Sequence, residues 1–426
     1  MPRESYRNGN LDFEPRFGIA YQVTTNTTFR AAFGQYDDDN INMVLFTQTQ
    51  DGVAPFFLRD ETYQINSQAV PTGFMNGSFP APAPGSIPQP GDIPPDAFRF
   101  VARYLPTPTL YQWSASVQRR LGSSWSLETN YVGSHTIHQL QYVDVNSPAL
   151  PQGPLADASL QERRPYPGWS TVATWLPMGY SKYESLLVSL KNNPWHGLSM
   201  MSNFMWAKNL TTMDPSNSEQ GNVDFRFPYI WAGPVDFTPA KSITIGYNYI
   251  LPLGRGKSFA SSAGPKLDKV VSGWTFSGIT RFSTGSPISV SGPDNSGGSN
   301  TSGSALLDKV AGCNPNNVPG GRDRFHLFNQ ACFTLPAYGV LGDSTLGSIT
   351  APGINNWDLA LSKITRTGFP RETGEVQFRV DMFNAFNHTQ WGAPDNYGPQ
   401  SVEPTMGWAF STRPPRLIQF VLKYRF

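Results

Sequence analysis

The sequence lacks any apolar run that approaches the ~20 residues needed for a transmembrane helix. Charged residues make up only 15% of the 426 residues, below the ~25% of ordinary soluble proteins. The 32 Lys+Arg nearly balance the 31 Asp+Glu, which excludes the strongly basic composition of a nucleic-acid-binding protein. Low charge together with 13% aromatic residues argues against disorder. Membrane-spanning strands are not excluded, because their signal is alternation rather than bulk hydropathy.

Cysteine is almost absent as well. The two cysteines, Cys313 and Cys332, lie in one stretch rich in Gly, Pro and Asn, without a His or Cys at metal-binding spacing. They form either a local disulfide in an oxidising compartment or two free thiols. The disulfide is our first interpretation.

The last eleven residues show what the sequence does contain. From Arg416 to Phe426 it reads RLIQFVLKYRF, and side chains in a strand alternate between two faces. One face then carries only apolar or aromatic residues, which are Ile418, Phe420, Leu422, Tyr424 and Phe426. The other face holds Gln419, Lys423 and Arg425. This pattern fits a core-packed edge strand of a soluble sandwich or a lipid-facing strand of a barrel.

The same alternation recurs along the chain and predicts eleven strands. Their ranges are 16–23, 28–36, 110–121, 125–134, 182–192, 198–209, 242–250, 273–283, 356–364, 375–385 and 416–426. Charges within strands fall almost always on the polar face. Arg119 and Lys363 are exceptions near strand ends, where long cationic side chains reach the membrane interface. A soluble sandwich would carry far more Lys and Glu on its solvent-facing sides.

The connections between these strands alternate between short and long. The long ones are 37–109, 135–181, 210–241, 284–355 and 386–415, whereas 251–272 is long for a turn. Outer-membrane barrels have this alternation, with short periplasmic turns and longer extracellular loops. The sequence therefore predicts an all-β antiparallel meander of a transmembrane β-barrel with a periplasmic C-terminus. The Pro-rich 79–95 and Gly/Ser-rich 291–304 segments are expected in loops where nothing must be packed.

The strand count predicts a partial barrel. Eleven is odd, bacterial barrels normally have even counts, and an open sheet edge is too costly in hydrocarbon. No secretion signal follows Met1, so the protein either stays inside the cell or is the later part of a longer chain. We expect residues 1–426 to be about half of a 22-stranded barrel, of the kind known among plugged transporters.

Several segments in this order resemble the C-terminal barrel region of Oar-like TonB-dependent outer-membrane receptors. They are PRFGIAY from Pro15, YQWSASVQR from Tyr111, NYVGS from Asn130, YILPLGRG from Tyr249, GW from Gly273, STGSP from Ser283, FRVDMFNAFNH from Phe378 and the final YRF. The resemblance implies energy-coupled import of a large or scarce ligand, driven by the TonB complex through an N-terminal plug. That plug and the earlier strands are not in this sequence.

The resemblance also assigns a role to the aromatic terminus. Phe420, Leu422, Tyr424 and Phe426 are similar to the signal that the barrel-assembly machinery recognises. The lipid of the outer membrane would then surround the strands. No cofactor, metal or catalytic residue is predicted. His135 and His138 have no third ligand nearby, and Leu251 replaces a glycine that a phosphate loop before Gly256-Lys257-Ser258 would need.

Loop aromatics are the candidates for contact with an extracellular ligand. Trp169, Trp175 and Tyr180 lie in or beside the 135–181 connection, and exposed rings stack on sugars or peptides. The competing interpretation is that these rings pack the loops or line the membrane interface. Two other functions remain open: a passive porin-like channel, and a secreted β-rich carbohydrate-binding protein.

Overall fold

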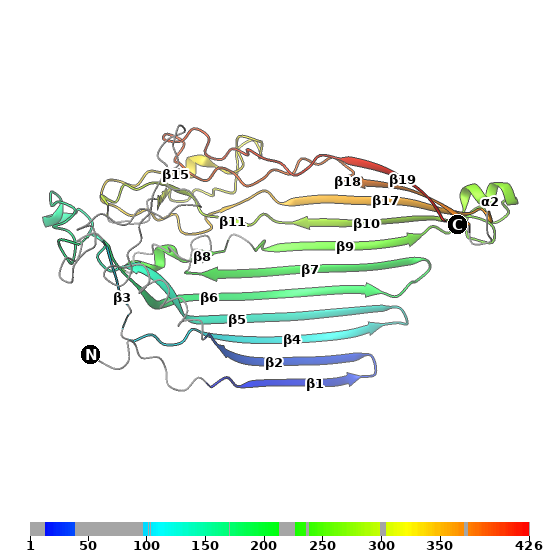
Figure 1. The fold of residues 1–426 in the computed structure, drawn as a ribbon, viewed down its shortest axis with the longest axis horizontal. Coiled ribbons are helices and arrows are strands. Elements are labelled where there is room, and N and C mark those ends of the chain that lie inside the picture. Colours follow the sequence, from blue (N-terminus) through cyan, green and yellow to red (C-terminus); the bar gives the residue numbers. More distant parts are fainter. Residues whose placement is uncertain are drawn as a thin grey trace, which may run out of the picture.

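A computed structural model describes residues 13–38, 97–100, 102, 104–169, 171–212, 226–235, 238–298, 304–369 and 374–425. Its main feature is one large sheet in which neighbouring long strands follow one another in the chain and pair antiparallel (Figure 1). The long strands are β1 (Arg16–Thr24), β2 (Thr27–Asp37), β4 (Thr109–Leu121), β5 (Trp125–Asp144), β6 (Thr171–Asn192), β7 (Leu198–Thr211), β9 (Lys241–Ile250), β10 (Trp274–Ser283), β17 (Ile354–Arg366), β18 (Glu375–Phe383) and β19 (Leu417–Arg425). The predicted antiparallel meander is confirmed.

Shorter elements lie in the connections. The strands are β3 (Ala97–Phe100), β8 (Gly233–Pro234), β11 (Pro287–Ile288), β12 (Ser291–Pro293), β13 (Ser304–Leu306), β14 (Asp308–Lys309), β15 (Phe333–Thr334) and β16 (Ile349–Thr350). The helices are η1 (Gly153–Leu155), η2 (Pro228–Trp231), α2 (Pro265–Val271) and η3 (Gln330–Cys332). Helix α2 accounts for the unexpectedly long turn between β9 and β10. None of the described helices has the length and hydropathy of a membrane-spanning helix.

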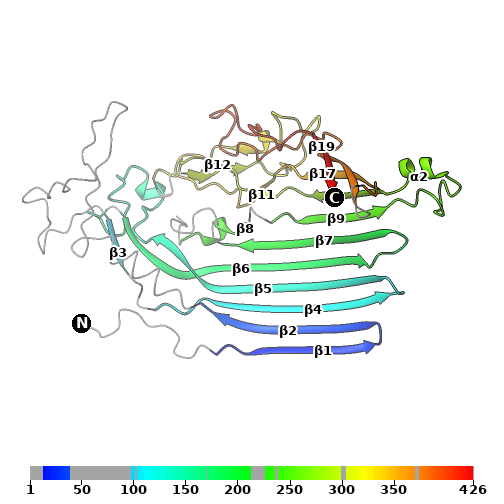
Figure 2. The same cartoon turned by 45° about the vertical axis from the view of Figure 1, so that its right-hand side comes forward.

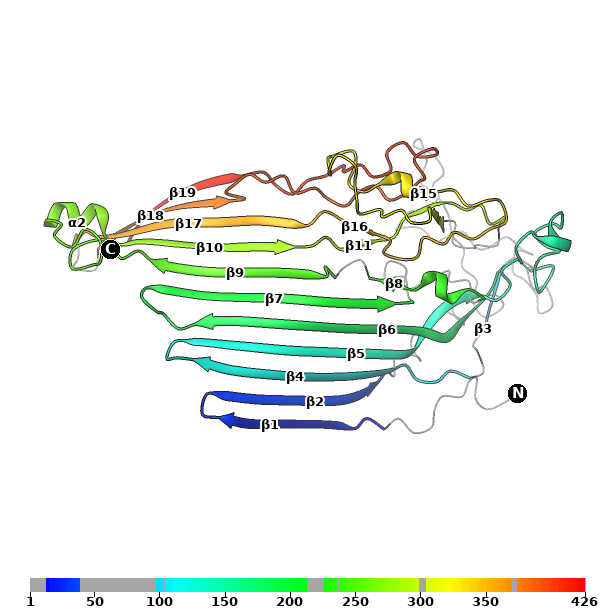
Figure 3. The same cartoon turned by 180° about the vertical axis from the view of Figure 1, so that it is seen from behind.

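The two ends of the sheet differ in their connections. Tight turns and α2 lie at one end, and the long connections gather at the other (Figure 3). We call these the turn end and the loop end. Strands β18 and β19 are inclined to β1–β7, so the sheet is curved (Figure 2). In the described residues β1 pairs only with β2 and β19 only with β18, which leaves the sheet with two free edges.

The register places residues of one kind on one face across the whole sheet, because directly opposed residues share a face. One continuous row is polar in all nine strands that it crosses: Gln22, Thr28, Gln118, Glu128, Ser189, Asn203, Thr244, Arg281 and Asn356. The adjacent row lies on the opposite face and is mostly apolar: Tyr21, Phe29, Val117, Thr129, Val188, Phe204, Ile243, Phe282 and Asn355. Nearer the turn end, another apolar row joins Leu198, Tyr249, Phe276, Leu361, Val380 and Phe420. The sheet therefore has an apolar face and a polar face, as the alternation predicts.

Aromatic side chains bound the apolar face at both ends. At the turn end the rings of Trp125 and Trp195 lie edge to face with centroids 6.2 Å apart. At the loop end the ring centroid of Trp357 lies 5.5 Å from those of both Phe282 and Phe386. Such rings mark the membrane–water interfaces of barrels, where the apolar body meets lipid and the polar atoms meet water.

The hairpin of β5 and β6 is longer than the sequence predicts. Strand β5 continues to Asp144 and β6 begins at Thr171, where we expected a loop from 135 to 181. The register shifts between Thr136 and Gln139 and again before Gln141, and His138 has a φ of 58°. These bulges break the period of two, which hides the strand from a test based on alternation.

Two long connections, 284–353 and 384–416, fold together into a lobe with its own apolar core. Its buried residues are Val290, Leu307, Phe328, Cys332, Phe333, Ile349 and Met406. Within it the sulfurs of Cys313 and Cys332 are bonded, with Cα atoms 5.4 Å apart. The expectation that the Gly/Ser-rich stretch packs against nothing is wrong for its described part, because Gly292 lies against Leu307 and Gly398. The Pro-rich 79–95 segment lies outside the described residues.

Candidate functional site

The three loop aromatics predicted to contact a ligand have different positions. Trp175 lies on β6, is 4% exposed and packs with Leu105, and its ring meets Tyr142 edge to face at 5.3 Å. Its ring therefore presents no face to an external ligand, which corrects the expectation from the sequence. Tyr180 also lies on β6, is partly exposed and contacts the ring of His135 at 6.4 Å.

Trp169, the third, lines a pocket at the loop end. The pocket has a volume of about 280 Å³ and is walled by Phe100, Val145, Tyr166, Trp169 and Val172. Phe100 reaches it because β3 runs parallel to the start of β6, where Thr174 Oγ1 donates to the Phe100 carbonyl at 2.7 Å. The volume lies just below the ~300–1,000 Å³ of ligand pockets, so this pocket would hold one ring or side chain of a larger molecule.

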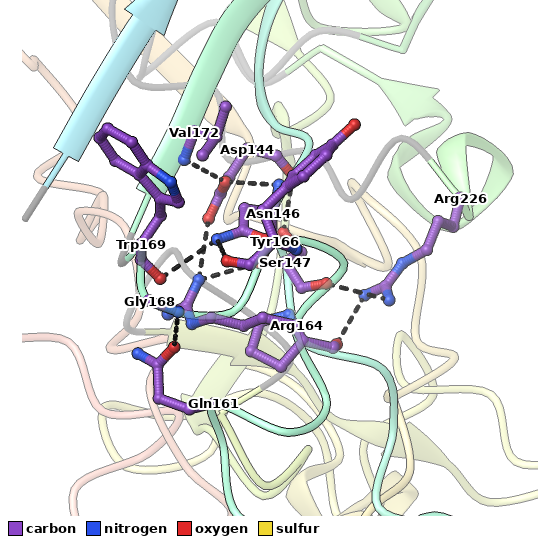
Figure 4. A network of polar contacts seen from close by, with 11 residues as sticks. Asp144, Asn146, Ser147, Gln161, Arg164, Tyr166, Gly168, Trp169, Val172 and Arg226 are labelled. Carbon is purple, nitrogen blue, oxygen red and sulfur yellow. Dashed lines mark hydrogen bonds and ion pairs between the residues drawn. The ribbon is translucent and has the colours of Figure 1, made fainter. Parts of the chain in front are cut away.

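Asn146 fixes two walls of this pocket. The residue is fully buried, and its Nδ2 donates to the carbonyls of Tyr166 at 3.1 Å and Trp169 at 3.2 Å. Its Oδ1 accepts the Tyr166 backbone N–H at 2.7 Å (Figure 4). One side chain therefore holds the backbone of both aromatic residues, although they lie on the returning half of the loop.

Asp144 is the last residue of β5, at the loop end of the sheet, and it accepts a hydrogen bond from the backbone of Asn146. Its Oδ1 accepts the backbone N–H of Asn146 at 2.8 Å and of Val172 at 2.9 Å, and its Oδ2 lies 3.9 Å from Arg164 Nη1 (Figure 4). Burial raises the pKa of the Asp144 carboxyl above its ordinary value. The two N–H groups, Arg164 and Arg226 act in the opposite direction but do not outweigh burial.

Two arginines attach the first half of the loop to this network. Arg164 Nη1 donates to the Asn146 carbonyl at 2.8 Å. Arg226, from the next long connection, donates to the carbonyls of Ser147 at 3.3 Å and Pro148 at 3.0 Å. The pocket is thus held by charge-assisted bonds to backbone, which pre-organises it before any ligand arrives.

The sequence gives little sign of this network. Asp144, Asn146, Ser147 and Pro148 form a recognisable turn signal, but a turn does not reveal which carbonyls 20 or 23 residues further along the side chain of Asn146 will bind. No cluster of three or more His, Cys, Asp or Glu side chains suited to a metal occurs in the described part of the chain.

The predicted assembly signal lies on the free edge strand. Phe420, Leu422 and Tyr424 are exposed side chains of β19, on the apolar face, opposite Val380, Phe378 and Val376 of β18. Phe426 lies outside the described residues. On the polar face, a broad groove of about 760 Å³ crosses β7, β9, β10, β17 and β18 and contains Asp358, Arg379 and Asp381.

Several solved structures resemble this chain at low sequence identity. No curated protein matches the sequence. Similar solved structures include the outer membrane transporter YddB from Escherichia coli, with 11% identity and a TM-score of 0.45 over 96% of this chain and 40% of that one. The ferric preacinetobactin receptor BauA from Acinetobacter baumannii has 12% identity and a TM-score of 0.41, over 96% and 36%. The siderophore receptor PiuA from the same organism has 10% identity and a TM-score of 0.40, over 96% and 35%.

This chain thus spans at most 40% of the length of those three proteins. The model of the family described as "Outer membrane beta barrel domain" matches residues 1–419, which is nearly the whole sequence. The chain therefore belongs to the outer membrane beta barrel domain family.

Proposed function

We propose that this chain is part of the barrel of an Oar-like, TonB-dependent receptor that imports a large or scarce ligand across the outer membrane. The observation that carries the proposal is the pre-organised loop end. There Asn146 holds the walls of the pocket, and the disulfide-containing lobe lies beyond the ends of the strands. A passive channel has no need of a built pocket in its outer loops. A receptor that must capture a scarce ligand does.

The free edges of the sheet support a larger barrel. Strands β1 and β19 both run toward the turn end, because an odd number of antiparallel strands separates them in the sheet order. Direct closure of β1 on β19 would therefore make a parallel joint. We propose that an odd number of further strands completes the barrel, with residues 1–426 as its C-terminal half and a plug and earlier strands outside this sequence.

The orientation follows the same proposal. The loop end faces the exterior and β19 ends in the periplasm, since barrels place short turns inside and long loops outside. Phe420, Leu422, Tyr424 and Phe426 then serve the barrel-assembly machinery, and the TonB complex acts through the region outside this sequence. Trp169 and Tyr180 are the proposed ligand contacts.

Conductance of the complete natural protein separates the receptor from its alternatives. The protein is isolated from outer membranes and inserted into planar bilayers in KCl. A plugged receptor gives no steady open-channel current, whereas a stable ohmic current in every insertion would establish the passive channel. Recovery of the protein in the medium, without a heat-dependent gel shift, would establish the secreted alternative.

Energy coupling needs a second measurement. Binding of candidate peptides, proteins and carbohydrates to whole cells is compared with their uptake in strains with and without TonB. Binding in both strains with uptake only in the TonB-containing strain is expected. Trp169→Ala should weaken that binding, and Trp175→Phe, which keeps a buried ring, serves as the matched control.

A further inference from the structure

A group of lysines surrounds an exposed tryptophan on the apolar face, at the border with the loop end. Trp206 of β7 is 55% exposed and is the direct register partner of Lys241 on β9. Two residues further along β7 on the same face is Lys208, opposite Glu184 of β6. Lys182 lies on this face of β6 as well. We call Lys182, Lys208 and Lys241 the lysine patch.

The patch lies where the apolar face of three adjacent strands, β6, β7 and β9, changes from apolar to charged residues. Read from the turn end, the face of β7 carries Leu198, Met200, Ser202, Phe204, Trp206 and then Lys208. The same face of β6 carries Leu190, Val188 and Leu186 and then Glu184 and Lys182. On β9 it carries Tyr249, Tyr247, Ile245 and Ile243 and then Lys241. The register brings all three changes to within one step of Trp206. Trp206 therefore marks the edge of the hydrocarbon region.

Among the described residues, only one of the three lysines of the patch has a carboxylate partner. Lys182 Nζ pairs with Glu184 Oε1 at 2.9 Å, which uses the nearest carboxylate. Lys241 Nζ lies 5.8 Å from the ring centroid of Trp206. In the part of the chain that the structure describes, no carboxylate forms an ion pair with Lys208 or Lys241. Lys208 and Lys241 are thus exposed beside an interfacial ring, and neither forms an ion pair with a carboxylate of the described residues.

Among the described residues, Lys363, on the apolar face at the turn end, has a hydrogen bond that Lys208 and Lys241 lack. Lys363 Nζ donates to the Ser272 carbonyl at 2.5 Å and lies 5.2 Å from the ring centroid of Trp274. The Lys363 ammonium group therefore already has a hydrogen-bond acceptor within the protein. Lys363 thus has partners within the protein, whereas no ion pair involving Lys208 or Lys241 occurs in the described residues.

We propose that the lysine patch binds the phosphate of an anionic lipid headgroup. Long lysine side chains at the hydrocarbon border extend toward the headgroups, where the compact ammonium group suits a phosphate oxygen. The face on which the patch stands is the lipid-facing one, so a lipid reaches it by lateral diffusion. In the orientation proposed above, the lipid belongs to the outer leaflet. The binding itself depends on family membership and not on the identity of the imported ligand.

Native mass spectrometry of the complete natural protein tests this site. The delipidated protein in detergent is titrated with short-chain phosphatidylglycerol, which is anionic, and with phosphatidylcholine, which is zwitterionic. The double variant Lys208→Gln/Lys241→Gln should bind phosphatidylglycerol about tenfold more weakly, with phosphatidylcholine binding unchanged. The charge-preserving variant Lys208→Arg/Lys241→Arg should retain most of the binding.

A matched control removes two cations from the polar face, as Lys191→Gln/Arg281→Gln. Equal loss of phosphatidylglycerol binding in this control would overturn the proposal, because the effect would then be one of net charge. Unchanged binding in the Lys208→Gln/Lys241→Gln variant would overturn it as well. Competition by inorganic phosphate at the same concentration as the lipid would instead indicate a site for free phosphate. A heat-dependent gel shift establishes that each variant is folded.

Discussion

The side-chain amide of Asn146 donates to the carbonyl of Trp169 at 3.2 Å and so joins two residues that lie 23 positions apart on opposite halves of one loop. Its oxygen accepts the backbone N–H of Tyr166 at the same time. A buried amide with all these partners is strongly constrained, since each unmade bond would leave a polar group without water. Asn146 thus fixes the backbone of two of the five residues that line the pocket.

Asn146→Ala should open this loop without affecting the barrel. Removing about three net hydrogen bonds, each worth ~1 kcal/mol, lowers the local free energy of opening by about 2–4 kcal/mol. Limited proteolysis should then cleave within 145–170 much faster, while the heat-dependent gel shift stays unchanged. Asp157→Ala, at an exposed site of the same loop, is the control. Equal cleavage of the two variants would contradict the role of Asn146.

Asp144 should make the stability of the same loop depend on pH. Burial raises the pKa of its carboxyl, so folding favours the protonated form. This stabilisation is complete below the ordinary carboxyl pKa of ~4 and is lost as the pH rises through the raised value. Amide exchange of the 145–170 loop should therefore show a lower opening free energy at neutral pH than at acidic pH.

Asp144→Asn separates charge from hydrogen bonding in that measurement. Both backbone N–H groups, of Asn146 and Val172, donate to the same oxygen of Asp144, which an amide oxygen can replace. The asparagine variant should hence flatten the pH dependence and keep the loop closed. Asp144→Ala loses both acceptors and should open the loop at every pH. An unchanged pH profile in the asparagine variant would assign the titration to another group.

The sequence predicts the long strands of the sheet but neither the outer parts of β5 and β6 nor the packing of the loops. Alternation such as Ile243-Thr244-Ile245 records the two environments of a sheet directly in the chain. The bulges around His138 break that record and conceal the outer part of β5. The pocket depends on contacts among Phe100, Asn146 and Trp169, and no local pattern encodes contacts between distant segments. The residues that pack inside the loops do not recur at a regular spacing in the sequence, whereas those on the two faces of the sheet alternate.

The Cys313–Cys332 bond should stabilise the lobe formed by the connections 284–353 and 384–416. It closes a separation of 19 residues beside the buried Phe328 and Phe333, for which chain entropy predicts about 3 kcal/mol. Cys313→Ser/Cys332→Ser should increase proteolysis within 304–353 and leave the strands protected. Alkylation of the native protein without reductant, followed by mass spectrometry, checks the bond itself. Two alkylated thiols would establish the free-thiol alternative.

Two adjacent methionines on β7 provide the sharpest test of the two faces. Met200 pairs with Tyr247 on the apolar face, and Met201 pairs with Gly246 on the polar face. Both residues are methionines, and they lie at nearly the same depth in the membrane because they are adjacent in β7. Arginine variants at the two sites therefore differ mainly in the face of the sheet that carries the charge. On the lipid side near the midplane an arginine costs ~2–4 kcal/mol. Met200→Arg should therefore lower the urea midpoint of the vesicle-inserted natural protein, whereas Met201→Arg, hydrated on the polar side, should change it little. Equal destabilisation by both variants, or a larger effect at Met201, would mean that the face bearing Phe204 and Ile243 does not meet acyl chains.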